Sequence, residues 1–364
     1  MSSTFDDALS ARLQQAHVLV TGAAGFIGSH VVETLLASGA RVKAMVRYNS
    51  RNDAGWLRDV RSELPADAAG RLEIVAGDVT DAGLVAQHMH ECTHVLHLAA
   101  LIGIPYSYVA PASYVATNVQ GTLNILEAAR QQAIKGIVIT STSEVYGSAR
   151  QVPIREDHPL VGQSPYSASK IAADQLAISY RRSFGLPVAV IRPFNTYGPR
   201  QSLRAVIPTI IAQVLADRAR KPGGASLQIR LGATETVRDL TFAPDTAQGI
   251  VAGLLAADNP AMTADDSATP HPEVFNLGTG EGWSVAQIVE EIAAISGQEI
   301  RVLRDEARLR PASSEVTRLI SDHSRMRDLL GWQPRWSLRE GLEVTFRWFE
   351  RKKTFTFESE NYTI

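Results

Sequence analysis

Cysteine is nearly absent from this chain of 364 residues, and long apolar runs are missing. Because Cys92 is the only cysteine, neither an intramolecular disulfide nor a cysteine-rich metal site can form. No run of about 18 apolar residues occurs, which excludes a conventional membrane span. The first fifteen residues contain Asp6, Asp7 and Arg12 without a sustained apolar core, so they do not resemble a secretory signal. These absences predict a cytoplasmic protein without a bound metal.

An excess of charge is also missing, since 36 Lys and Arg side chains face 38 Asp and Glu, for a formal charge of −2. This balance argues against a nucleic-acid partner and against an anionic membrane surface. Lysine is scarce, with six residues against thirty arginines, so a lysine at a chemically useful spacing is informative. The length and the 45% hydrophobic fraction predict a globular protein of about two domains.

The first half of the chain alternates short β-branched runs with longer helical patterns. This alternation is typical of βαβ units that build a parallel sheet. Apolar spacing predicts helices over residues 26–38, 81–90, 112–130 and 166–184. Strands are predicted over residues 17–21, 41–46, 72–76, 94–98, 136–140 and 187–192. The predicted fold class is therefore α/β, a doubly wound parallel sheet of the Rossmann type.

After Pro193 the alternation gives way to Pro- and Gly-rich connections and isolated elements, such as residues 274–277 and the helical pattern of 285–295. We predict a smaller, mixed α/β domain that binds the substrate above the sheet. The first domain would comprise residues 15–196 and about 239–275, and the second about 197–238 and 276–350. Residues 259–272 are predicted to be an exposed loop and 351–364 a tail.

Three glycines, Gly22, Gly25 and Gly28, follow the first predicted strand and open the first predicted helix, together with Phe26 and Ile27. Glycine there permits a tight turn and a close approach of the backbone to a pyrophosphate, which the helix amino terminus attracts through its N–H groups and dipole. An ordinary glycine-rich turn is the alternative. The position between strand and helix at the start of an alternating chain favours a dinucleotide site.

Further cofactor contacts are predicted where later strands end. Asp78, followed by Val79, comes after the third strand and could accept a hydrogen bond from an adenine amino group; its alternative role is a helix cap near Asp81. Small residues at the end of the fourth strand let a cofactor approach the backbone of Leu98, Ala99 and Ala100. The neighbouring His97 is predicted to be a packed strand residue.

The end of the second strand bears on the choice between NAD and NADP, because a carboxylate there would bind a ribose 2′-OH and repel a 2′-phosphate. The segment Met45-Val46-Arg47-Tyr48-Asn49-Ser50 contains no acid. Arg47 and Ser50 suit a 2′-phosphate, so NADP is favoured. A solvated arginine is the alternative.

Of the nine tyrosines, only Tyr166 is followed four residues later by a lysine, Lys170. Random placement of these residues would give about 0.15 such pairs. The spacing is one helical turn, so an ammonium can favour the tyrosinate, and the phenol can exchange a proton with a substrate hydroxyl. The alternative is an exposed pair on a helix.

The fifth predicted strand runs into Thr142, Ser143 and Glu144. This is the carboxyl end of a parallel strand, where open α/β sheets bind ligands. Thr142 can hydrogen-bond a sugar hydroxyl, while Ser143 and Glu144 add a proton donor or acceptor and a carboxylate. A polar loop with a surface glutamate is the alternative.

Together these elements resemble the extended short-chain dehydrogenase/reductase family that acts on nucleotide sugars. The resemblance extends from His17 to about Phe346. It implies a tightly bound NAD or NADP and a homodimer formed through the helices predicted at residues 112–130 and 166–184. The matching elements are Gly22, Gly25, Gly28, Asp78, Asn118, Thr142, Tyr166, Lys170 and the run Arg192-Pro193-Phe194-Asn195-Thr196-Tyr197-Gly198-Pro199-Arg200.

Within that family, residues 100–108 and 308–316 are especially similar to the 4,6-dehydratases of the legionaminic-acid pathway. This implies an NDP-N-acetylglucosamine substrate with GDP or UDP as carrier, and a 4-keto-6-deoxy product. Arginine suits the carrier diphosphate because its planar donors make bidentate contacts. The implied substrate contacts are Ile104, Thr142, Asn195, Arg200, Arg204, Arg238, Arg310 and Glu315.

Ser143 leaves other activities open. Many dTDP-glucose dehydratases carry an aspartate at this place, whereas GDP-mannose 4,6-dehydratases resemble this chain in having serine. UDP-glucuronate decarboxylases also use Ser-Glu, so decarboxylation is the nearest enzymatic alternative, beside 4-epimerisation. A non-catalytic dinucleotide sensor is the alternative from another class, although such proteins typically lack the Tyr–Lys pair.

Overall fold

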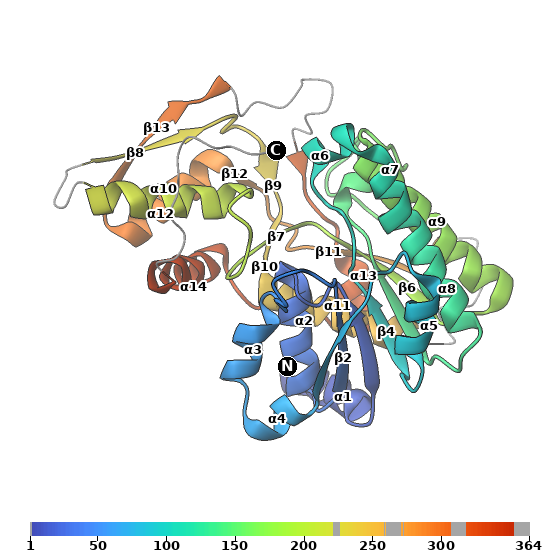
Figure 1. Cartoon of the computed structure of the whole chain (residues 1–364). Helices are drawn as coiled ribbons and strands as arrows, with labels where there is room; N and C mark the ends of the chain where they lie inside the picture. The colour runs from blue at the N-terminus through green and yellow to red at the C-terminus, as the bar shows by residue number, and fades with distance from the viewer. Residues whose placement is uncertain are drawn as a thin grey trace.

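The computed structural model describes residues 2–220, 226–257, 259, 271, 273–306 and 318–352. A seven-stranded sheet forms the centre of the larger part of the molecule (Figure 1). Its strands are β1 (His17–Thr21), β2 (Arg41–Val46), β3 (Leu72–Ala76), β4 (His94–His97), β5 (Gly136–Thr140), β6 (Val188–Pro193) and β11 (Val274–Leu277). The strand order is β11-β6-β5-β4-β1-β2-β3, and every neighbouring pair is parallel. This confirms the doubly wound Rossmann sheet, with its topological switch point between β1 and β4.

Helices cover both faces of the sheet, because alternate side chains of each strand feed two separate cores. One core joins the sheet to α1 (Ser2–Leu13), α2 (Phe26–Ala37) and α11 (Ala243–Ala257). The other joins it to α5 (Ala82–Met89), α8 (Gly121–Arg130) and α9 (Pro165–Phe184). Short helices α3 (Leu57–Glu63), α4 (Ala66–Gly70) and α6 (Ile104–Val109) occupy connections where the sequence predicted no element.

The helix predicted over residues 112–130 is divided. It consists of α7 (Pro111–Tyr114), a π-helical turn η1 (Val115–Gln120) and α8. The turn η1 contains Asn118, whose side chain donates to the Leu101 carbonyl at 3.0 Å and accepts from the Leu101 N–H at 2.8 Å. A π-helical turn inside a helix often marks a functional position.

The smaller part has a core of its own, which confirms a mixed α/β unit beside the sheet. Its helices are α10 (Val206–Arg220), α12 (Val285–Ser296) and α14 (Leu338–Arg351). Its strands form parallel β8 (Ser226–Leu231) and β13 (Glu299–Arg304), and a sheet of β9 (Val237–Arg238), β12 (Trp283–Ser284) and β14 (Arg318–Leu319). The pair β7 (Asn195–Tyr197) and β10 (Leu240–Phe242) lies between the two parts (Figure 1).

Two boundaries differ from the expectation. Helix α13 (Ser324–Leu330) and Trp332 fall within the predicted second domain but pack into the core that contains α2 and α11. The Trp332 indole is fully buried and donates to the Asp245 carbonyl at 3.2 Å. At the predicted tail, Arg351 ends α14, and the Lys352 ammonium lies 2.6 Å from the Asp59 carboxylate of α3. Most of the predicted loop 259–272 and all of residues 353–364 lie outside the described residues.

Across the described ranges, no helix combines the length and apolar character needed to cross a membrane.

Candidate active site

The glycine turn between β1 and α2 forms a cradle that side chains would fill. Gly22 has a φ of +69°, and a Cβ there would lie 2.7 Å from the Ala99 backbone nitrogen. A Cβ on Gly28 would lie 2.2 Å from the Gly22 carbonyl oxygen. Helix α2 begins at Phe26 without a side-chain cap on its first N–H groups. This bare helix terminus over a tight turn fits the pyrophosphate of a dinucleotide.

Gly22→Ala is expected to lower the free energy of unfolding by about 1–3 kcal/mol and to weaken dinucleotide binding, because the methyl group would push against the strand end at Ala99. Gly185→Ala is a matched control, since Gly185 also has a positive φ of +67° but has open space around its Cβ position. Thermal unfolding and dinucleotide titration separate the two effects. Equal dinucleotide affinity in both variants would argue against the cradle.

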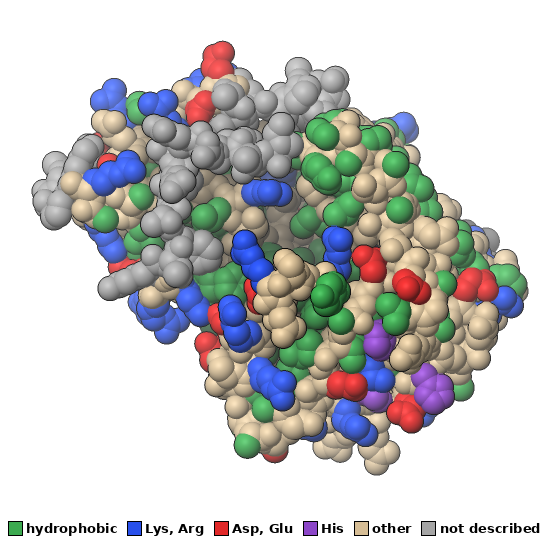
Figure 2. Space-filling model, in the orientation of Figure 1, with side chains coloured by type: hydrophobic (Ala, Val, Ile, Leu, Met, Phe, Trp, Pro, Cys, Tyr) green, Lys and Arg blue, Asp and Glu red, His purple; other side chains and the backbone are tan. Residues whose placement is uncertain are grey.

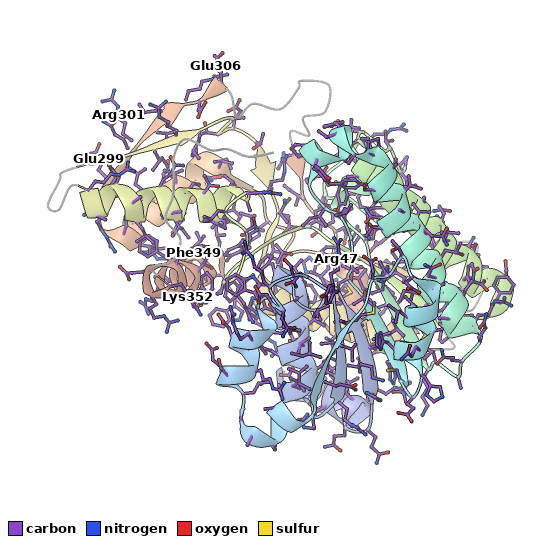
Figure 3. The ribbon with its side chains drawn as sticks, viewed as in Figure 1. Arg47, Glu299, Arg301, Glu306, Phe349 and Lys352 are labelled. Carbon is purple, nitrogen blue, oxygen red and sulfur yellow. The ribbon has the colours of Figure 1, made fainter. Side chains whose placement is uncertain are left out.

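Two charged side chains meet where β2 and β3 end. The Arg47 Nε lies 3.5 Å from an Asp78 carboxylate oxygen, and both side chains are substantially exposed. Figure 3 places Arg47 near the middle of the molecule, above the carboxyl ends of the strands. The other Asp78 oxygen accepts from the Thr80 N–H and hydroxyl at 3.0 and 2.9 Å. The cap of α5 is Asp81, which accepts from the Leu84 N–H at 3.0 Å, so the capping alternative for Asp78 is wrong.

The neighbouring loop has a fixed shape. The Asn49 side-chain oxygen accepts from the backbone of Arg51 and Asp53, each at 3.1 Å, and Ser50 in the same loop is exposed. On the other side of the sheet, Val79 is buried and its carbonyl accepts from the Asn124 side chain at 2.9 Å.

The end of β4 is fastened to β1 through His97 and Thr21. The His97 ring bonds the hydroxyls of Thr21 at 2.8 Å and Thr122 at 3.1 Å, and burial lowers the His97 pKa to about 3. The Thr21 hydroxyl also accepts from the Ala99 N–H at 3.2 Å. The prediction that His97 is a packed strand residue is therefore confirmed. The half-buried segment of Leu98 to Ala100 lies directly above the glycine turn.

Tyr166 and Lys170 occupy the start of α9, which opens with a reciprocal capping box between Ser164 and Ser167. Both side chains are buried, at 7% and 4% exposure, so the exposed-pair alternative is wrong. The Lys170 ammonium donates to the Thr140 carbonyl at 2.7 Å, and the Tyr166 hydroxyl shares a hydrogen bond with the Thr142 side chain.

Burial sets the protonation of this pair. It raises the pKa of Tyr166, and the Thr142 hydrogen bond only partly opposes it. It lowers the pKa of Lys170, against the charge of Asp174. The expectation that the lysine brings the phenol pKa down is thus not met in the chain alone, because desolvation dominates.

A 3₁₀ helix, η2 (Ser143–Tyr146), follows β5 after Ser141 and Thr142. Its cap is Thr142, whose hydroxyl accepts from the Glu144 N–H at 3.2 Å. Ser143 is buried, Glu144 is half-buried, and the Glu144 charge raises the pKa of Tyr166. The structure therefore brings the carboxylate of η2 and the phenol of α9 to one place.

Tyr114 is a site residue that the sequence did not reveal. Its ring meets Tyr166 edge-on at 6.3 Å, and its hydroxyl donates to the Gly103 carbonyl at 2.5 Å. Gly103 precedes α6, which begins at the half-buried Ile104. Asn118 extends the same support, since it donates to the Ser169 hydroxyl on α9 at 2.9 Å. These contacts hold the start of α9 against the segment that leads into α6.

The expected substrate contacts are distributed unevenly. Asn195 has a buried side-chain oxygen without a hydrogen-bond partner among the described residues. Burial raises the pKa of Tyr114, and the charge of the exposed Arg204 partly opposes this rise. Arg238 lies in β9. Figure 2 shows Lys and Arg side chains around the hollow between the two parts. Arg310 and Glu315 lie outside the described residues.

Arg200 does not join the other expected substrate contacts. Its guanidinium is 9% exposed, forms an ion pair with Glu33 and lies 2.7 Å from the His30 ring nitrogen. Both partners are on α2, so Arg200 ties the segment after β7 to the helix of the glycine turn rather than facing a diphosphate.

The chain matches the GDP-mannose 4,6 dehydratase family over residues 19–345. It is 30% identical to a dTDP-glucose 4,6-dehydratase of Actinoplanes sp. over 93% of this chain and 99% of that protein. It is 33% identical to a UDP-glucose 4-epimerase of Mycolicibacterium smegmatis, over 92% and 98%. The crystal structure of a Streptomyces venezuelae dTDP-glucose 4,6-dehydratase with NAD and TYD bound superposes with a TM-score of 0.76 at 30% identity, covering 93% of this chain and 98% of that one. The chain therefore belongs to the GDP-mannose 4,6-dehydratase family of extended short-chain dehydrogenase/reductases.

Proposed function

We propose that the protein is a 4,6-dehydratase that converts GDP- or UDP-N-acetylglucosamine to the 4-keto-6-deoxy sugar nucleotide. The observation that carries this proposal is the meeting of two sets of groups at the end of β5. Tyr166 and Lys170 on α9 suit oxidation at C4, and Ser143 and Glu144 on η2 suit loss of water across C5 and C6. Two sets are needed because the reaction joins an oxidation to an elimination.

A bound nicotinamide dinucleotide supplies a reversible hydride acceptor with a positively charged ring. Tyr166 takes the proton of the C4 hydroxyl, and the Lys170 cation stabilises the charge of the phenolate. The resulting 4-ketone makes the C5 proton acidic, and Glu144 removes it. The C6 hydroxyl leaves as water with a proton from Ser143 or from protonated Glu144. The sugar loses one water overall, and the dinucleotide ends the cycle in the form in which it began.

The carrier side of the site is proposed to consist of Asn195, Arg204 and Arg238, with Arg310 and Glu315. The unpartnered buried oxygen of Asn195 supports a ligand there, because a buried polar atom without a partner is costly. Arginine supports a diphosphate through bidentate hydrogen bonds.

We propose NADP as the preferred dinucleotide. The Arg47 side chain is exposed, and among the described residues its guanidinium contacts the Asp78 carboxylate at 3.5 Å, so it can turn toward a 2′-phosphate. Arg47→Ala is expected to weaken NADP binding by about 10- to 100-fold, the loss of one charge-assisted hydrogen bond, while NAD binding changes little. Titrating both dinucleotides into protein stripped of cofactor measures this difference. Arg58→Ala, another exposed arginine nearby, is the control, and tighter NAD binding by the unaltered protein would contradict the preference.

The proposed reaction is tested by the mass of its products. GDP- and UDP-N-acetylglucosamine, dTDP-glucose and UDP-glucuronate are incubated separately with the protein. Loss of water from an N-acetylglucosamine nucleotide supports the proposal, and loss of water only from dTDP-glucose corrects the substrate. Loss of carbon dioxide from UDP-glucuronate indicates a decarboxylase, and an isomer of unchanged mass indicates an epimerase. A protein that binds dinucleotide and alters none of these substrates would be a sensor.

A further inference from the structure

A buried ion pair lies directly behind the catalytic pair. Tyr166, Lys170 and Asp174 follow one another at four-residue spacing, so they share one face of α9. Asp174 is fully buried, and its carboxylate accepts from the Arg192 Nε of β6 at 3.0 Å. Placing two charges in the interior carries a desolvation cost that a pair of apolar side chains would avoid. The Asp174–Arg192 ion pair therefore needs an explanation other than packing.

Arg192 divides its donors between two elements. While Nε holds Asp174, Nη1 donates to the Tyr146 hydroxyl at 2.9 Å, and the guanidinium carbon lies 5.0 Å from the centre of the Tyr146 ring. Tyr146 is the last residue of η2, the short helix that contains Ser143 and Glu144. The two ends of the connection are therefore the two elements that hold the catalytic groups.

The connection is anchored deeper in the sheet. The Tyr146 hydroxyl donates to the Asn276 side chain of β11 at 2.6 Å, and the Asn276 N–H donates to the Glu156 carboxylate at 2.8 Å. Tyr146, Asn276 and Glu156 are all buried. The Tyr146 hydroxyl thus accepts from Arg192 and donates to Asn276. Because both hydrogen bonds are buried, η2 cannot shift without breaking one of them.

We propose that Asp174 is a positioning residue that, through Arg192 and Tyr146, holds Tyr166 and Lys170 on α9 in register with Ser143 and Glu144 on η2. That these groups perform an oxidation and an elimination rests on the proposed function. The buried connection between α9 and η2 would serve any reaction that uses groups of both helices.

The charge of Asp174 adds a second readout. Burial lowers the pKa of Lys170 and the Asp174 carboxylate opposes this, so removing that charge lowers the pKa of Lys170 further. His97 adds no charge near Lys170 at neutral pH, because its pKa is about 3. The alkaline limb of the oxidation step is then expected to move to lower pH. The titratable and charged groups that face Tyr166 and Lys170, or the ion pair behind them, come from five elements. They are Asp174 on α9, His97 on β4, Tyr114 on α7, Glu144 and Tyr146 on η2, and Arg192 on β6.

The test compares Asp174→Asn with Tyr146→Phe in the holoenzyme. Asp174→Asn is expected to slow dinucleotide reduction by the sugar nucleotide about tenfold or more, as small misplacements of reacting groups do, and to shift its alkaline limb downward. Asp174→Glu restores much of both. Tyr146→Phe keeps the ring and both charges, so reduction stays near the unaltered rate while water loss slows about tenfold and reduced dinucleotide accumulates. KM for the sugar nucleotide stays unchanged in all three.

Asp245→Asn is the matched control, because Asp245 is a buried carboxylate that accepts from the backbone N–H groups of Arg335 and Trp336 and lies on the opposite side of the sheet, in α11. It should lower the unfolding temperature and leave the pH limb and the balance of the two steps unchanged. If the Asp174 and Tyr146 variants behave like this control, the connection is merely structural and the proposal is wrong. Should Asp174→Asn fail to fold, Asp174→Glu and Tyr146→Phe decide the question. The pH limb can be measured whatever product forms, so an epimerised product would overturn the proposed function and leave this test standing.

Discussion

Replacing Tyr166 with phenylalanine is expected to stop hydride transfer from the sugar nucleotide to the bound dinucleotide, lowering kcat by about 10² to 10⁴. The Tyr166 hydroxyl bonds the Thr142 side chain, and Lys170 lies one helical turn further along α9, where its ammonium donates to the Thr140 carbonyl. The role proposed for the phenol oxygen is to take the C4 proton. The ring itself packs edge-on against Tyr114, and phenylalanine preserves that contact. Folding and substrate binding should therefore remain close to those of the unaltered protein.

Rapid mixing of the Tyr166→Phe variant with sugar nucleotide, followed by the near-ultraviolet absorbance of reduced nicotinamide, measures this step alone. Tyr180→Phe is the matched control on the same helix, because its hydroxyl donates to Glu127 away from the site. We expect the control to reduce its dinucleotide at the normal rate. Unchanged turnover in Tyr166→Phe would remove the phenol from the mechanism.

The parallel sheet could be read from the sequence because its signal is local. Strands buried on both faces appear as short apolar, β-branched runs, and β1, β2, β3 and β5 begin and end at the predicted residues. The glycine turn and the Tyr166–Lys170 spacing are local for the same reason, since each depends on residues within one turn or one helix.

Features that depend on distant partners were missed. The helix predicted over residues 112–130 is interrupted where Asn118 forms two hydrogen bonds with Leu101. The apolar periodicity of that segment gives no sign of these bonds, because Leu101 lies outside it. The pairing of Asp174 with Arg192 joins α9 to β6, and the pairing of Arg200 with Glu33 joins the segment after β7 to α2. An arginine has the same sequence signature whether it binds a diphosphate or a buried carboxylate, and only the fold distinguishes them.

Glu144→Gln is expected to separate the oxidation from the elimination. Glutamine keeps the size of the side chain and does not disturb the backbone hydrogen bond to Thr142, but it cannot accept the C5 proton. The C4 oxidation should proceed, while water loss falls by about 10² to 10⁴, the usual contribution of a positioned base. Reduced dinucleotide then accumulates to the level of the active sites and decays slowly.

Deuterium from solvent provides a direct measurement of the step proposed for Glu144. In heavy water, the unaltered enzyme should incorporate deuterium at C5 of its product, because the proton that Glu144 removes exchanges with solvent before C5 is protonated again. Glu144→Gln should reduce its dinucleotide without this incorporation, whereas Tyr166→Phe should show neither signal. Glu127→Gln, a carboxylate change on α8 near Tyr180, is the control and should show both. Full incorporation and full turnover in Glu144→Gln would exclude this carboxylate as the base and leave Ser143 as the group of η2 that could act on the leaving water.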